Sequence, residues 1–165
     1  MMYRIEKVLN HNTVIAIHQD DHKEVLIMGK GVGFGRKVAE RIEVRPEDRL
    51  YSLQKYKERG GAKEIVKSIA PEFLELTNAV LNEAEKVFGK IDRMVLFPLA
   101  DHIAFAVKRI QNHEQISNPL TEDIRVLFHM EFKVAESIRP LLKKQFQIDI
   151  ETTRSDMWHF ISIRQ

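Results

Sequence analysis

The sequence contains no cysteine and no hydrophobic run long enough to cross a membrane. Without cysteine the chain cannot form disulfides or thiolate zinc sites, and we expect a reducing, cytoplasmic location. A membrane-spanning helix needs roughly 18 consecutive apolar residues, so we expect no membrane insertion. The N-terminal residues also lack the apolar core and the cleavage site of a signal peptide, so we expect none. The composition, 44% hydrophobic and 30% charged, is that of a folded globular protein.

Net charge is also small, but the positive excess is unevenly distributed along the chain. The formal net charge is +2; residues 1–55 contain ten Lys and Arg against eight Asp and Glu, whereas residues 56–165 contain sixteen of each. A net charge of this size does not indicate nucleic-acid binding by itself. The local group of Lys30, Arg36 and Lys37 is better evidence, because three cations fall within one short segment.

Glycine is scarce, and four of the seven glycines occupy alternate positions in one segment, GKGVGFG. The same segment contains Lys30 and Phe34, and Arg36 follows it directly. Glycine backbone has no side chains that would keep a partner away. Together with cations and an aromatic ring, it can approach a folded polyanion closely. This combination favours RNA as the ligand.

The main enzymatic alternative for such a segment is a loop that binds nucleotide phosphates. The spacing fits neither G-x-x-x-x-G-K-[ST] nor G-x-G-x-x-G. The segment also follows a predicted hairpin strand and does not open a helix, so no helix dipole would hold a pyrophosphate. A glycine-rich sheet edge without any ligand remains a second alternative.

The first 55 residues predict a small antiparallel β domain. Three strand-length runs rich in Val and Ile, bounded by turn formers, occupy Tyr3–Leu9, Thr13–His18 and Glu24–Met28. Arg49–Leu53 is a candidate fourth strand, and Asn10-His11-Asn12 suits a tight turn. A sheet this small buries little surface alone, so we expect a homodimer.

The remainder of the chain predicts helices, which makes the fold class α+β. A polar segment with Gly60-Gly61 predicts a linker at 56–62 between the β domain at 1–55 and an all-α helical bundle at 63–165. A helix is expected from Pro71 to about Phe88, ended by Gly89. Apolar residues at helical spacing predict two more, one over residues 91–110 and one over residues 124–138.

In combination and order, these motifs resemble a known family. Asn10-x-Asn12 with VLIMGKGVGFGRK resembles the co-antiterminator RNA-binding domain that opens BglG/SacY-type bacterial transcriptional antiterminators. The segments LADHIAFAVKR, NPLTEDI and LFHMEFKVA resemble the first phosphotransferase regulation domain (PRD) of those proteins. The resemblance covers nearly the whole chain.

The resemblance implies an RNA-binding face on a symmetric dimer, formed by Lys7, Asn10, Asn12, Gly29, Lys30, Gly31 and Phe34. The residue types suit this role, since Phe34 offers a stacking surface and Lys7, Lys30 and Arg36 would neutralise phosphates. The amides of Asn10 and Asn12 can donate to and accept from base edges. Taken alone, the two asparagines fit a turn equally well, and they can serve both purposes.

A second candidate site surrounds His102. Without the resemblance, an Asp101-His102 pair on an apolar helix is more often a structural histidine. The resemblance implies that His102 instead exchanges phosphoryl groups with proteins of the sugar phosphotransferase system. Asp101 could orient its ring and Arg109 could balance a phosphate.

One position departs from the family pattern. Near the end of the first PRD, relatives usually have a second histidine, in a run like Asp-Glu-x-Gly-Phe-Ile-Ala-Leu-His, where this chain has Arg164. A guanidinium has no acceptor lone pair and cannot be phosphorylated as imidazole can. We expect Arg164 to stabilise phosphorylated His102 instead.

The function implied is transcriptional antitermination through an RNA hairpin, controlled by histidine phosphorylation, with no catalysis, cofactor or metal expected. The alternative is a helical phosphocarrier or signalling module whose β domain binds a protein. A DNA-binding regulator is a weaker alternative, because the sequence shows no helix-turn-helix with a basic recognition helix.

Overall fold

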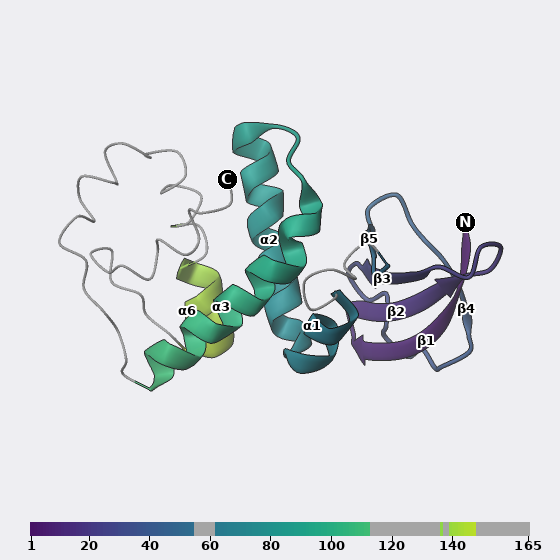
Figure 1. Ribbon diagram of the computed structural model, residues 1–165, viewed down its shortest axis with the longest axis horizontal. Coiled ribbons are helices and arrows are strands. Elements are labelled where there is room, and N and C mark those ends of the chain that lie inside the picture. Colours follow the sequence, from purple (N-terminus) through teal and green to yellow (C-terminus); the bar gives the residue numbers. More distant parts are fainter. Residues whose placement is uncertain (55–61, 113–135, 137–138, 148–165) are drawn as a thin grey trace. The chain divides into compact units, whose positions relative to one another are not determined.

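The structure is a computed structural model that describes residues 1–54, 62–112, 136 and 139–147. The chain divides into two compact units, Met1–Pro71 and Glu72–Gln165. The first contains an antiparallel sheet and one short helix, and the second is helical where it is described (Figure 1).

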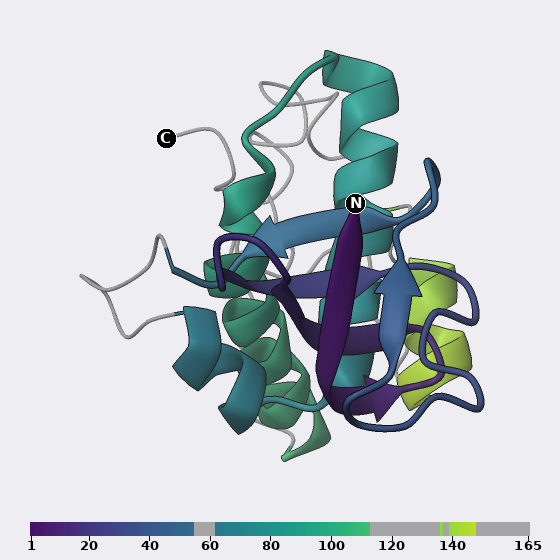
Figure 2. The same ribbon diagram turned by 90° about the vertical axis from the view of Figure 1, so that its right-hand side faces the viewer.

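The sheet has five strands in the order β4-β1-β2-β3-β5. Their bounds are β1 Met2–Asn10, β2 Thr13–His18, β3 Glu24–Met28, β4 Arg41–Glu43 and β5 Arg49–Ser52. The three expected strands and the candidate fourth are confirmed, but β4 was not predicted. It has only three residues, too few to show a period, and it forms by pairing with the distant start of β1, as Tyr3 opposite Ile42 illustrates. Figure 2 shows the sheet with the start of β1 toward the viewer.

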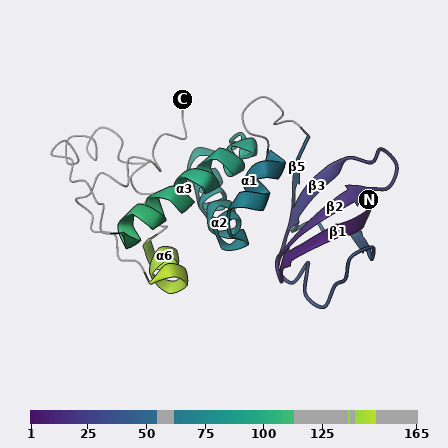
Figure 3. The same ribbon diagram turned by 60° about the horizontal axis from the view of Figure 1, so that its bottom comes forward.

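One face of the sheet carries a buried hydrophobic cluster, and the opposite face buries Ile15, Leu26 and Tyr51. β1 alternates between buried Tyr3 and Ile5 and exposed neighbours, as a half-buried strand does. Register shifts interrupt β1 between Ile5 and Lys7 and again between Val8 and Asn10. Such bulges bend a strand and increase its twist, which is visible in Figure 3. The buried cluster on this face consists of Tyr3, Ile5, Val14, Ala16, Ile27, Val32 and Ile42.

The helix α1, Ala62–Ser68, belongs to the same unit as the sheet. Its Ala62 and Val66 are buried, and Lys63 forms an ion pair with Glu24 of β3. Residues 55–61, which hold most of the expected linker, lie outside the described ranges.

The helical unit contains α2 Pro71–Phe88, the 3-10 turn η1 Arg93–Val95, α3 Leu96–Gln111 and α6 Arg139–Phe146. The predicted bounds of α2 are confirmed: Pro71 is its first residue, and Gly89 follows with a φ of 76°. The second helix starts later than expected. Asp92 caps η1 by accepting a hydrogen bond from the Met94 amide, and α3 begins only at Leu96. The third expected helix falls mostly outside the described residues. None of the described helices is long and apolar enough to cross a bilayer.

Candidate nucleic-acid interface

The glycine segment forms a loop of consecutive tight turns directly after β3; we call residues 29–37 the glycine loop. Its backbone hydrogen bonds run from the amide of Val32 to Gly29 O (3.1 Å), from Phe34 to Gly31 O (3.1 Å) and from Arg36 to Gly33 O (3.2 Å). Gly31 and Gly35 have φ values of 71° and 68°, a conformation that favours glycine. No helix starts within this loop, which agrees with the exclusion of a nucleotide-phosphate loop.

Side chains of the β1–β2 turn hold the glycine loop in place. Asn10 Oδ1 accepts a hydrogen bond from the Asn12 amide at 2.9 Å, which closes the turn. Asn12 Oδ1 in turn accepts from the amide of Gly31 at 2.8 Å, across 19 residues of sequence. Both asparagines therefore have the structural role that the sequence left open, and their role in RNA binding stays a prediction.

Backbone contacts join the same two segments. The Gly29 amide donates to Asn12 O and the Gly33 amide donates to His11 O, both at 2.9 Å. The approach is so close that a Cβ atom at Gly33 would lie 2.2 Å from the carbonyl oxygen of Asn10. Turn and loop are thus one rigid surface, built from two segments that the sheet brings together.

The loop presents an exposed aromatic ring. Phe34 is 69% exposed, although a large apolar side chain is normally buried. Its ring meets the ring of His11 edge to face, with centroids 5.2 Å apart and an interplanar angle of 81°. The sequence predicts His11 only as a turn residue, because nothing local signals this contact. Lys30, in the same loop, is also exposed.

A third segment, the turn between β4 and β5, also reaches the glycine loop. The Asp48 side chain is fully buried, and the Arg45 guanidinium bonds both of its oxygens and the carbonyl oxygen of Lys30. Burial raises the pKa of the Asp48 carboxyl, but the hydrogen bonds from Arg45 outweigh it and hold the pKa below its ordinary value. Sequence reasoning missed both residues, because an Arg-Pro-Glu-Asp turn reads locally as a solvated loop.

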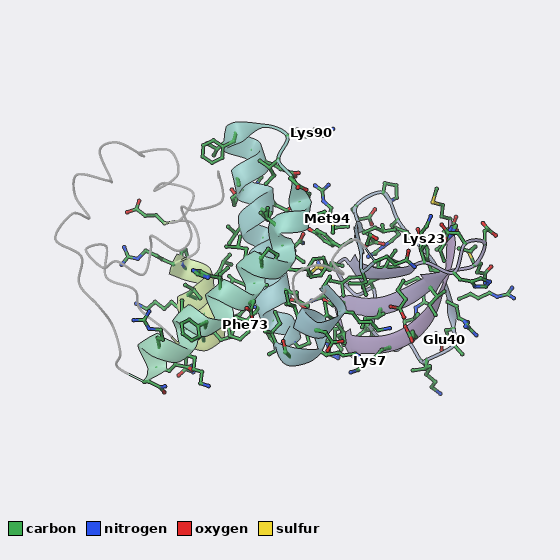
Figure 4. The ribbon with its side chains drawn as sticks, viewed as in Figure 1. Lys7, Lys23, Glu40, Phe73, Lys90 and Met94 are labelled. Atoms are coloured by element: carbon green, nitrogen blue, oxygen red, sulfur yellow. The ribbon has the colours of Figure 1, made fainter. Side chains whose placement is uncertain are left out.

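The other two cations predicted to neutralise phosphates, Lys7 and Arg36, make fewer contacts with this surface. Lys7 is exposed on β1, opposite Ile15 (Figure 4). Within the described part of the chain, no hydrogen bond or ion pair joins it to the glycine loop. Arg36 lies 3.7 Å from a carboxylate oxygen of Glu40, and both side chains are exposed. Such a pair contributes little, so Glu40 does not fix the Arg36 side chain in place, and the role of Arg36 in RNA binding stays a prediction.

The second candidate site lies on α3. Asp101 and His102 are both exposed, whereas the inner side of the helix buries Leu99, Ala100, Ile103, Ala106 and Val107. His102 is therefore accessible to another protein and is not a buried core histidine. Arg109 follows two turns later, with its guanidinium carbon 6.0 Å from the ring centroid of the exposed Phe105. Arg164 lies outside the described residues.

These features define a two-part protein, a β domain with an ordered glycine loop and an exposed aromatic ring followed by a helical domain with an exposed histidine. Comparison with known families agrees: residues 3–60 match the CAT RNA binding domain and residues 75–153 match the PRD domain. The chain belongs to the antiterminator family that joins these two domains, and it is homologous to GlcT-type antiterminators.

Named relatives support the same grouping. The GlcA/glcB genes antiterminator of Staphylococcus carnosus is 30% identical over 152 residues, which cover 89% of this chain and 52% of that protein. Protein GlcT of Staphylococcus epidermidis is 27% identical over 151 residues, 88% of this chain and 52% of that protein. The chain thus spans about half the length of these curated relatives.

A solved structure confirms the fold class. The crystal structure of GlcT CAT-PRDI superposes with a TM-score of 0.76 at 26% sequence identity, covering 99% of this chain and 98% of that one. The five-stranded antiparallel sheet followed by helices is therefore the fold of that protein too.

Proposed function

We propose that this chain is the RNA-binding and regulatory part of a transcriptional antiterminator. A dimer of the β domain would bind an RNA hairpin that overlaps a terminator, so that the terminator cannot form and transcription continues into a sugar-utilisation operon. The family match supports RNA as the partner, and the names of the relatives support antitermination.

The observation that carries the proposal is the surface formed by the glycine loop and the β1–β2 turn. Its loop contains the exposed ring of Phe34, the exposed Lys30 and the backbone of Gly31 within one segment of five residues. Unpaired bases can stack on the ring, and the ammonium group can neutralise a phosphate. Because the amides of Gly29 and Gly31 donate hydrogen bonds to Asn12 and order the loop before binding, little conformational entropy is lost on association.

A binding titration with a partly paired RNA hairpin at two salt concentrations tests this function. We expect binding that weakens as salt rises, with a shallower salt dependence for Lys30→Ala, because that variant releases fewer counterions. Sedimentation of the complex should show two copies of the chain on one hairpin. Absence of hairpin binding, or binding by a helical fragment alone, would contradict the proposal.

Control would come from phosphorylation of His102. The exposed imidazole can accept a phosphoryl group from a phosphohistidine of a phosphotransferase protein, as one nitrogen–phosphorus bond forms and the other breaks. The added charge of about two units can make or break a contact between helical domains. Asp101 and Arg109 occupy the same helix and would orient the ring and balance the phosphate.

Mass spectrometry after incubation with the general phosphotransferase proteins and a sugar-specific component tests this control. We expect one acid-labile phosphate, on His102, and none on the His102→Ala variant. A single phosphate is expected because Arg164 occupies the place of the family's second histidine. Two phosphates on the unmodified chain, or full labelling of the variant, would contradict this assignment.

A further inference from the structure

The space beneath Gly29 is occupied by the Asp48 carboxylate. A Cβ atom at Gly29 would lie 1.8 Å from Asp48 Oδ1, so only glycine leaves room for this side chain. The side chain of Asp48 is 0% exposed, and a buried carboxylate must be paired and hydrogen-bonded to be tolerated. The turn between β4 and β5 therefore packs directly against the start of the glycine loop.

Arg45 satisfies this carboxylate completely. Its Nη2 atom donates to Asp48 Oδ1 at 2.7 Å, its Nε atom donates to Asp48 Oδ2 at 3.1 Å, and its backbone amide donates to Asp48 Oδ2 at 2.9 Å. The Asp48 amide donates back to Arg45 O at 3.0 Å, which closes the turn. Two-pronged bonding of this kind uses the planar fork of a guanidinium and cannot be reproduced by lysine.

The same guanidinium holds the peptide bond between Lys30 and Gly31. Arg45 Nη2 donates to the carbonyl oxygen of Lys30 at 2.8 Å, and the amide of Gly31 donates to Asn12 Oδ1 at 2.8 Å. The C=O and N–H groups of one peptide plane are thus bound from opposite sides. Gly31 has a positive φ and would otherwise let this plane rotate easily.

We propose that Arg45 and Asp48 are positioning residues for RNA recognition, which fix the Lys30–Gly31 peptide so that the Lys30 side chain and the Gly31 backbone face the RNA. The inference rests on the proposed RNA-binding function and adds two residues that neither the sequence motif nor the family match assigns. Arg45 acts here through the loop and does not itself neutralise a phosphate.

The decisive variant is Arg45→Lys in the full chain, tested with the partly paired RNA hairpin. It keeps the positive charge but loses the fork, so we expect the RNA affinity to fall about tenfold, the effect of losing a charge-assisted hydrogen bond. If Arg45 contacted a phosphate directly, lysine would preserve most of the affinity, and the inference would be wrong. The matched control is Glu47→Gln, which alters an exposed carboxylate 3.6 Å from the same guanidinium and should leave affinity unchanged.

A double-mutant cycle with Lys30→Ala separates positioning from an independent effect. If Arg45 acts through Lys30, adding Arg45→Lys to Lys30→Ala should weaken binding far less than tenfold. If the losses of RNA affinity from the two substitutions simply multiply in the double variant, the inference is overturned. Hydrogen exchange of the Gly31 amide supplies a readout without RNA, and it should accelerate in Arg45→Lys while thermal unfolding shows the fold intact. An unchanged exchange rate would also overturn it.

The wild-type titration in the same series separates a failure of the proposed function from a failure of the inference about Arg45 and Asp48. If the wild-type chain binds no hairpin, the proposed function fails and the inference fails with it. If wild type binds and Arg45→Lys binds equally well, only the inference fails. Asp48→Asn should repeat the effect of Arg45→Lys, since an amide cannot accept at both positions.

Discussion

The four glycines of the glycine loop are required for two different reasons. Gly31 and Gly35 adopt positive φ with open space around the position of a Cβ atom. Gly29 and Gly33 have no room for one, because Asp48 and the carbonyl oxygen of Asn10 already fill the space. The alternating pattern therefore combines a conformational requirement with a packing requirement.

We expect alanine to be tolerated at Gly31 and not at Gly33. Gly31→Ala should cost about 1 kcal/mol of unfolding free energy from backbone strain, because the side chain meets nothing. Gly33→Ala should cost clearly more, since the added Cβ would lie 2.2 Å from backbone that has to move. Chemical denaturation of the two variants measures the difference, and equal losses would show that packing does not restrict Gly33.

Phe34→Ala should weaken RNA binding without destabilising the protein. The ring is mostly exposed, so little buried area is lost, whereas each base–aromatic stack contributes about 1–3 kcal/mol to binding. Titration with the hairpin and thermal unfolding measure the two quantities. Val38→Ala, which changes another exposed apolar side chain after the same loop, is the control and should alter neither. Unchanged RNA affinity in Phe34→Ala would remove the ring from the interface.

At the scale of elements, the β2–β3 turn has its own electrostatic network at the other end of the strands from the glycine loop. Asp21 Oδ2 lies 2.6 Å from Lys23 Nζ, and Asp21 Oδ1 lies 2.9 Å from His18 Nδ1. Bonds from Lys23 and from His18 lower the pKa of the Asp21 carboxyl to about 2. The turn is therefore held by an ionised carboxylate.

Acid should loosen this turn in a defined pH window. A carboxyl whose pKa is lower in the folded state stabilises the fold above its unfolded pKa of about 4. That contribution is lost as pH falls from about 4 toward 2, where the folded carboxyl takes up its proton. The Asp21→Asn variant lacks the group, so its stability should change less over this window. Acid unfolding of both proteins, with an NMR titration of Asp21, measures the effect; identical curves would contradict it.

For the whole molecule, the division into units predicts which fragment folds alone. The unit Met1–Pro71 includes α1 as well as the sheet, and α1 contributes buried Ala62 and Val66 and the Lys63–Glu24 ion pair. The ion pair is only partly buried and adds little, so the apolar burial accounts for most of the contribution of α1.

A fragment of residues 1–71 should fold and bind the hairpin, with about 2 kcal/mol more stability than residues 1–55, because burying Val66 alone is worth roughly that amount. Denaturation of the two fragments at matched concentration measures this, since each is expected to dimerise. A fragment 1–71 that is no more stable than 1–55 would show that α1 does not stabilise the β domain.

The sequence by itself determined the features that depend on neighbouring residues. Runs rich in Val and Ile and bounded by turn formers predicted β1, β2 and β3. The positions of Pro71 and Gly89 predicted the ends of α2, and the place of the glycine segment after a hairpin strand predicted a loop that does not open a helix. These patterns follow local rules of side-chain period, turn geometry and helix capping, so they can be read without a fold.

Only the tertiary structure decided which segments meet at the site. Strand β4 exists because the start of β1 offers it a partner, the ring of His11 meets Phe34, and Arg45 reaches the carbonyl oxygen of Lys30 across 15 residues. Each contact joins segments that are adjacent only after the sheet has formed, and no local pattern marks either partner. The loop's order comes from such long-range hydrogen bonds, because glycine-rich backbone has too much conformational freedom to hold one shape alone.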